Sequence, residues 1–169
     1  MRYLFLFPPI TLLLISCWVN NPSEAESEVV KEDVVTTAAE RAISERTIID
    51  SVATSWGWGD LVLPGGIRYA KYGQNTVLNS AESLVYLDVY VDLLNGNKCY
   101  WLDSIEVEVG KYAGIRAVDE ISKVICLGDS IVALVPSDFG HGLAGLPGVV
   151  PPGAMLKVTV SQQFRQEAQ

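Results

Sequence analysis

Side chains that commonly do chemistry in proteins are scarce in this chain. His141 is the only histidine, and the three cysteines, Cys17, Cys99 and Cys126, form no Cys-x-x-Cys pair. Zinc sites, Cys–His pairs and Ser–His–Asp triads all need such side chains to converge on one point. The sequence therefore supports no metal site, no covalent nucleophile and no bound cofactor. It leaves open whether Cys99 and Cys126 form a disulfide or stay as buried free thiols.

A long loop rich in glycine and proline is the most informative segment. Residues 132–160 read VALVPSDFGHGLAGLPGVVPPGAMLKVTV, so that an apolar strand-like stretch leads into the loop and a second, alternating stretch follows it. Prolines at 147, 151 and 152 and glycines at 140, 142, 145, 148 and 153 restrict its path, because proline fixes φ and glycine accepts left-handed turns. We expect a long but constrained connection between two strands.

This loop resembles the signature of FKBP-type peptidyl-prolyl isomerases, in which a segment of the form YG…G…IPP.A.L.F.V caps a proline-binding pocket. Residues 109–116 (VGKYAGIR) are similar to the strand end and G…VIRGW helix start of that family, and residues 127–129 (LGD) to its M..G turn. The resemblance is continuous over 105–160 and looser over 61–103. It implies an α+β fold in which an antiparallel β-sheet wraps around one short helix. Together with a lipobox-like LISC at 14–17, it suggests the bacterial envelope lipoprotein form of the family.

Isomerising the peptide bond before a proline needs neither a metal nor a nucleophile. The barrier of roughly 18–20 kcal/mol is the loss of amide resonance, and a dry apolar pocket lowers it because the twisted amide is less polar than the planar one. The resemblance implies that the backbone N–H of Ile115 donates to the substrate carbonyl. It implies substrate-binding walls at nine further residues: Val89, Tyr100, Ile105, Val118, His141, Leu146, Val149, Val150 and Val158.

Several of these wall residues are smaller or less aromatic than the family usually has. Val118 stands in place of a tryptophan at the pocket floor, Val158 in place of a phenylalanine, and Val89 in place of an inward tyrosine. His141 replaces a tyrosine and Ile105 replaces an aromatic wall. The segment 99–103 (CYWLD) has no clear match to the family's FD pair. Tyr100, Trp101 and Asp103 could partly restore that pair. Because an aromatic side chain buries about 150–250 Å², we expect a wider pocket that binds proline more weakly.

Alternation of apolar and polar residues predicts five antiparallel strands, over 67–72, 84–93, 105–109, 131–135 and 156–160. The clearest is 84–93, where residues 85, 87, 89, 91 and 93 share one apolar face. The Asn95-Gly96 pair that follows is a strong hairpin signal. A helical spacing over 116–124 predicts a short helix packed on the sheet. Strands, one helix and strands again indicate an α+β class without reference to any family.

An extra helix is expected before the first strand. Thr37, followed by Glu40, fits a capping box, and apolar residues then recur at helical spacing toward Trp56. Glycines at 57 and 59 should end this helix. We expect the tryptophans at 56 and 58 to pin the helix to the core, with a binding motif as the alternative.

The first residues resemble the signal of a bacterial lipoprotein. One arginine precedes the apolar run LFLFPPITLLLIS, which ends in a lipobox-like LISC at 14–17 and is too short to span a bilayer after processing. The sequence predicts a signal peptide over 1–16, a lipidated Cys17, an acidic, extended and flexible tether over 17–35, a helical extension over 36–60 and an isomerase domain over 61–169. An ordinary signal peptide cut nearby is the alternative.

Composition narrows the possible functions. A hydrophobic content of 49% excludes a wholly disordered chain, and a net charge of −8 without any cluster of lysine and arginine argues against nucleic acid as a partner. The leading hypothesis is a peptidyl-prolyl cis-trans isomerase that assists the folding of exported proteins by acting on their proline-containing segments. It would be lipid-anchored to a bacterial membrane and face the periplasm. The alternative is a non-catalytic FKBP-like lipoprotein that serves as a binding or assembly module.

Overall fold

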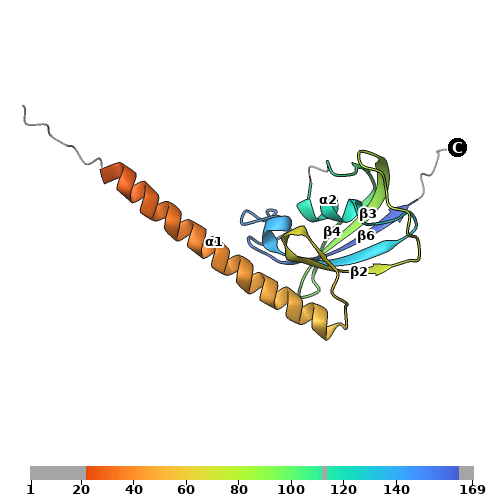
Figure 1. Cartoon of the computed structure of the whole chain (residues 1–169), viewed down its shortest axis with the longest axis horizontal. Coiled ribbons are helices and arrows are strands. Elements are labelled where there is room, and N and C mark those ends of the chain that lie inside the picture. The colour runs from red at the N-terminus through yellow and green to blue at the C-terminus, as the bar shows by residue number, and fades with distance from the viewer. Residues whose placement is uncertain (1–21, 112–113, 164–169) are drawn as a thin grey trace, which may run out of the picture. The chain divides into compact units, whose positions relative to one another are not determined.

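An antiparallel sheet forms the body of the protein (Figure 1). The computed structural model describes residues 22–111 and 114–163. Within these residues the six strands run in the spatial order β1-β2-β5-β6-β3-β4, and each adjacent pair is antiparallel. This arrangement confirms the predicted α+β class. The strands are β1 (Val62–Leu63), β2 (Ile67–Tyr72), β3 (Leu84–Leu93), β4 (Lys98–Glu108), β5 (Ser130–Val135) and β6 (Leu156–Gln163).

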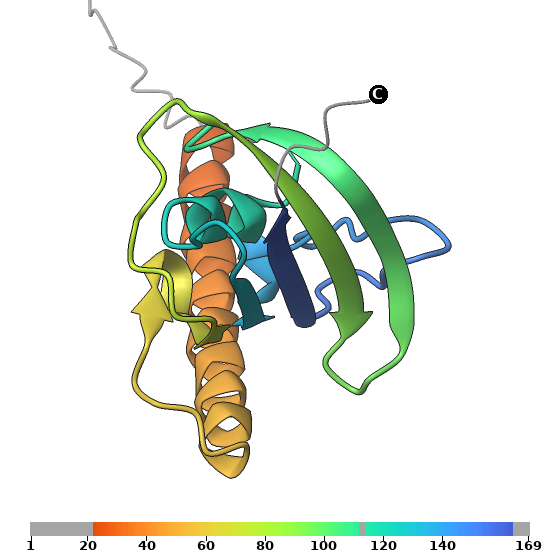
Figure 2. The ribbon, with the colours of Figure 1, turned by 90° about the vertical axis from the view of Figure 1, so that its right-hand side faces the viewer.

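The short helix α2 (Arg116–Ser122) packs against one face of the sheet, where the main core lies. Its Ala117, Val118 and Ile121 are fully buried together with alternate residues of β3 and β6. Figure 2 shows β3 and β4 curving, with α2 on their concave side. The helix ends two residues before the predicted position, because the N–H groups of Val124 and Ile125 both turn back to the carbonyl of Ile121.

Strand β3 has the predicted bounds, whereas β4 is longer than its alternation predicts. The pairing register of β3 with β4 shifts opposite Asp88, which marks a β-bulge. Ser104 lies in this bulge with φ of 48°, and its N–H donates to Asp88 Oδ1 at 2.8 Å. The bulge takes the N–H of Ser104 out of the strand-to-strand hydrogen bonding, and the Asp88 carboxylate accepts this N–H instead. Two polar residues at 103–104 therefore interrupt the sequence pattern without ending the strand.

Helix α1 (Pro22–Ser55) begins earlier than the capping box predicts. The helix is continuous through Thr37, so the predicted start at that residue is wrong, and residues 22–35 are helical rather than extended. Proline can open a helix because the N–H groups of the first turn have no partner within the helix. Chain contacts divide the protein into two compact units, Met1–Thr37 and Ala38–Gln169. The assignment of tether, extension and isomerase domain stays a prediction.

Within the second unit, the C-terminal half of α1 packs on the sheet face opposite to α2. Ile49 and Ala53 are fully buried in a cluster with Leu134 of β5. The neighbours of Leu134 in β5, Ala133 and Val135, belong to the main core, and successive side chains of a strand point to opposite faces. The sheet is therefore covered on both sides at β5.

The end of α1 is fixed by a glycine cap and a tryptophan. Gly57 has φ of 70°, its N–H donates to Thr54 O, and the N–H of Trp58 donates to Ala53 O, both at 3.0 Å. These two bonds make a Schellman motif, which favours glycine at this position. The Trp58 ring packs against the Ile49 cluster. This contact confirms the predicted pinning role for Trp58, whereas Trp56 is 45% exposed and the prediction is wrong for it.

Both cysteines of the folded unit are free thiols. Cys126 is buried, with its Sγ 3.0 Å from Lys71 Nζ, and Cys99 is half-buried on β4. Burial raises the pKa of the Cys99 thiol. Of the two alternatives that the sequence leaves open, the structure therefore has free thiols.

Candidate functional site

The glycine- and proline-rich loop between β5 and β6 is held by its own backbone. Leu146 and Val150 exchange N–H···O bonds of 2.8 Å in both directions, and the N–H of Val149 donates to Leu146 O at 2.9 Å. Pro147 and Gly148 lie between them, and Gly148 has φ of 74°. Proline followed by glycine at positive φ is typical of the two central positions of a type II turn. The loop tip is therefore a defined turn, within the long but constrained connection that the sequence predicts.

This turn separates the predicted wall residues of the loop into two groups. Leu146 and Val149 are exposed at the tip, and Val150 is buried in the main core. Gly145, with φ of 65°, crosses so close to Val150 O and Pro151 that a Cβ there would overlap their backbone atoms. The loop thus exposes the side chains of Leu146 and Val149 to solvent, and its backbone has little conformational freedom.

His141 and Tyr100 join this loop to strand β4. Tyr100 Oη lies 2.8 Å from His141 Nε2, and the two rings meet edge to face with centroids 5.8 Å apart. Burial lowers the pKa of His141, so the imidazole is neutral at pH 7. A neutral imidazole beside a phenol gives the site a polar pair without a charge. The structure thus brings together two residues that the sequence predicts as walls.

Ile115 precedes α2 with its side chain buried and its backbone extended. Its carbonyl accepts the N–H of Val118 at 2.9 Å. Among the described residues, no acceptor pairs with the N–H of Ile115 itself. Arg116, the next residue, places its guanidinium 4.3 Å from the centre of the Phe139 ring in the loop. The free N–H therefore lies at the helix end that contacts the loop.

The predicted floor of the site is part of the hydrophobic core. Val89, Val118 and Val158 have no exposed surface, and Ile105 and Tyr100 are half-buried against the same cluster. Val89 faces inward, as counting along β3 predicts. In this structure the three valines fill the core rather than line an open wall, and their contact with a substrate stays a prediction.

No family model matches the chain, and no curated protein matches it. A solved structure does match, the peptidyl-prolyl cis-trans isomerase of Pseudomonas syringae pv. tomato str. DC3000, with a TM-score of 0.61 over 76% of this chain and 96% of that chain. The fold is FKBP-like. At 14% sequence identity, the likeness concerns the fold.

Two contacts of this FKBP-like fold were not predicted from the sequence. The carboxylate of Glu45 on α1 accepts the N–H and the O–H of Ser137, at 2.8 and 2.7 Å, across 92 residues of sequence. Ser137 begins the 3₁₀ helix η2 (Ser137–Phe139), which opens the loop. The Phe139 ring, at the end of η2, packs so tightly over Gly65 that a Cβ there would overlap it. A single sequence carries no signal for such distant pairs.

Within the described residues, the candidate site holds no cluster of acidic side chains or metal ligands. Among the described residues, no three His, Cys, Asp or Glu side chains gather as metal ligands would. Its elements are the backbone N–H of Ile115, which has no acceptor among the described residues, an apolar cluster, and a neutral polar pair between loop and sheet. Such a set can bind a peptide carbonyl and exclude water from it.

Proposed function

We propose that this protein is a peptidyl-prolyl cis-trans isomerase that assists the folding of exported proteins at a bacterial cell envelope. The observation that carries the proposal is the unpaired N–H of Ile115, at the helix end next to the loop, within an FKBP-like fold. It supplies the one hydrogen bond that the reaction needs, on a rigid element. Apart from this hydrogen bond, the reaction needs only an apolar surface around the twisting amide.

In the proposed reaction, the Ile115 N–H binds the carbonyl that precedes the substrate proline. Leu146 and Val149, at the tip of the type II turn, cover the proline ring from the loop side. As the amide twists, it loses polarity and gains from a drier surrounding, so the surface that excludes water favours the twisted state. His141 stays neutral and does not exchange protons with the substrate.

The envelope location rests on the N-terminal sequence. Residues 1–21, with the predicted signal peptide and the lipidated Cys17, lie outside the described residues. No helix within the described residues is long and apolar enough to cross a membrane. A lipid on Cys17 would supply the attachment, and proline-containing segments of exported proteins would be the substrates.

One observation favours the alternative of a non-catalytic binding module. Val118 and Val158 are fully buried aliphatic residues at positions where the resemblance implies aromatic walls. Loss of aromatic surface weakens the hold on a proline ring. A domain of this kind could keep a peptide-binding surface and accelerate nothing.

Exchange NMR on a Leu-Pro peptide separates these two functions. The isomerase proposal expects the full chain, in a mild detergent, to accelerate cis-trans exchange at substoichiometric concentration. The variant Val118→Trp/Val158→Phe, if its melting shows that it is folded, should bind the peptide more tightly and be more active. Because overpacking costs about 1–3 kcal/mol, folding has to be measured on the same sample. Absence of catalysis in both folded proteins would leave the binding module.

A further inference from the structure

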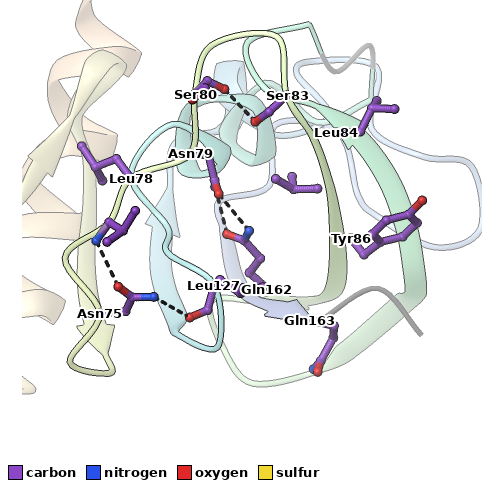
Figure 3. Close-up of a pocket in the computed structure, with 12 residues that line it drawn as sticks. Asn75, Leu78, Asn79, Ser80, Ser83, Leu84, Tyr86, Leu127, Gln162 and Gln163 are labelled. Carbon is purple, nitrogen blue, oxygen red and sulfur yellow. Dashed lines mark hydrogen bonds between the residues drawn. The ribbon is translucent and has the colours of Figure 1, made fainter. Parts of the chain in front are cut away.

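A hollow lies at the other end of the sheet from the proline-rich loop (Figure 3). The loop leads into the first residue of β6, Leu156, whereas the last residue, Gln163, lines this hollow. Its other walls come from the segment between β2 and β3, from the start of β3 and from the turn before β5. Its volume is about 610 Å³, within the range of about 300–1,000 Å³ that is usual for ligand pockets. The proposed reaction uses none of its residues.

Hydrogen bonds hold the frame of the hollow. Asn79 and Gln162 bind each other through two bonds of 2.9 Å, and Asn79 Nδ2 also reaches the carbonyls of Ser122 and Ile125 at 3.2 and 3.0 Å. Asn75 Nδ2 donates to the carbonyl of Leu127 at 3.1 Å. These amides fix the segment before β3 against α2, β6 and the turn. The walls are therefore set before any ligand arrives.

Aliphatic side chains surround this frame and stay open to solvent. Leu78 and Leu84 are each 59% exposed, Val77 is 72% exposed and Leu127 is 37% exposed. Figure 3 shows Leu78 and Leu84 on opposite sides of the hollow, with the Asn79–Gln162 pair between them. A rigid frame that keeps several aliphatic side chains in water is typical of a surface that binds another apolar surface.

The lining of the hollow is uncharged. All of its twelve side chains are aliphatic, amide, hydroxyl or phenol groups. The chain as a whole has 12 basic and 20 acidic residues, so a neutral surface of this size is a local feature. A charged segment would lose hydration there and gain no ion pair. The chemistry thus fits an uncharged, aliphatic stretch of polypeptide.

We propose that this hollow, lined by Leu78, Leu84 and Leu127, is a second binding site for the same unfolded polypeptide whose proline is isomerised. The inference rests on the proposed function. Strand β6 has eight residues from Leu156 to Gln163, which at about 3.3 Å per residue spans about 23 Å. About seven extended residues span the same length, so we place the aliphatic stretch of a test substrate about that far from its proline. Binding at one site raises the effective concentration at the other.

Two peptides test this proposal on the full chain in a mild detergent. The long peptide carries Leu-Pro and an uncharged Leu-Val-Leu stretch about seven residues away, and the short peptide ends just after the proline. We expect a kcat/KM at least about tenfold higher for the long peptide, because burial of a single aliphatic side chain already corresponds to roughly that factor. A long peptide with aspartates in the aliphatic stretch should behave like the short one.

The variant Leu78→Ser/Leu84→Ser should remove the advantage of the long peptide and leave the rate with the short peptide unchanged. Both leucines are mostly exposed, so the fold should tolerate serine. Ile43→Ser is the matched control, since Ile43 is an exposed aliphatic residue of α1 that is not part of the hollow. It should change neither rate.

Three results would overturn the inference. The first is that the wild-type protein has the same kcat/KM for the long peptide as for the short peptide. The second is an advantage of the long peptide that survives in Leu78→Ser/Leu84→Ser. The third is a wild-type protein that sediments as a dimer while Leu78→Ser/Leu84→Ser sediments as a monomer. The hollow would then bind a second copy of the chain. If the short peptide is not isomerised at all, the proposed function fails, and fluorescence anisotropy with the long peptide still decides whether the hollow binds it.

Discussion

The link between Glu45 and Ser137 attaches helix α1 to the start of the functional loop. Both residues are buried, and the carboxylate accepts the N–H of Ser137 at 2.8 Å and its O–H at 2.7 Å. Replacing Glu45 by alanine would remove both acceptors at once. Two donors of Ser137 would then stay buried without a partner, in the first residue of η2.

The expected loss follows from these two donors. A buried donor without a partner costs about 1–3 kcal/mol, so Glu45→Ala should destabilise the fold by about 2–6 kcal/mol. At roughly 2–4 °C per kcal/mol for a chain of this size, a central value of about 4 kcal/mol lowers the melting temperature by about 8–16 °C. Ser137→Ala removes only the hydroxyl donor and should cost less.

Thermal unfolding followed by circular dichroism measures this loss. Glu40→Ala is the matched control, because Glu40 lies exposed on the same helix. Hydrogen exchange of the loop amides should also become faster in Glu45→Ala and stay unchanged in Glu40→Ala. If both variants melt within about 2 °C of the wild type, a difference below about 1 kcal/mol, the carboxylate does not hold the loop and the reasoning is refuted.

Three further predictions concern the loop, its histidine and the N-terminus. Gly145→Ala should destabilise more than Gly148→Ala, since both need positive φ at about 1–2 kcal/mol but only at Gly145 would a Cβ meet the backbone at Val150; equal melting temperatures would contradict this. His141→Gln should lessen the acid sensitivity of the fold, because burial lowers the pKa of His141. Stability from the neutral imidazole is complete above the unfolded pKa of about 6.5 and is lost as pH falls through the folded pKa; parallel pH–stability curves for wild type and variant would disprove it. Cys17→Ala should release the protein from the membrane fraction of cells, and unchanged partition into detergent extracts would rule out the lipid anchor.

Local patterns in the sequence predict most of the sheet. Strand β3 keeps its alternation over ten residues because one face packs on the core and the other faces outward, and its bounds were predicted without error. The constrained path of the loop between β5 and β6 was also predicted, since proline and glycine restrict the backbone by themselves. Features encoded within a few residues could thus be predicted.

Features that depend on distant contacts could not be predicted in the same way. The start of β4 is hidden because its bulge is completed by Asp88 on another strand. The capping box at Thr37 is a valid local signal, yet the helix continues through it because the preceding residues are also helical. Glu45 looks like any surface glutamate of a helix until the fold brings Ser137 beside it. The burial of Val118 and Val158 likewise follows from packing between α2 and β6.

A comparison of isomerase activity between the variants Ile115→Pro and Ile115→Ala tests the central claim, the role of the Ile115 N–H, most directly. Ile115 has φ of −76°, which proline can adopt, and its N–H pairs with no acceptor among the described residues. Both variants lose buried side-chain volume, and only proline removes the N–H. We predict that Ile115→Ala still accelerates cis-trans exchange of a Leu-Pro peptide in NMR and that a folded Ile115→Pro does not. Equal acceleration by the two variants would contradict the role of this N–H.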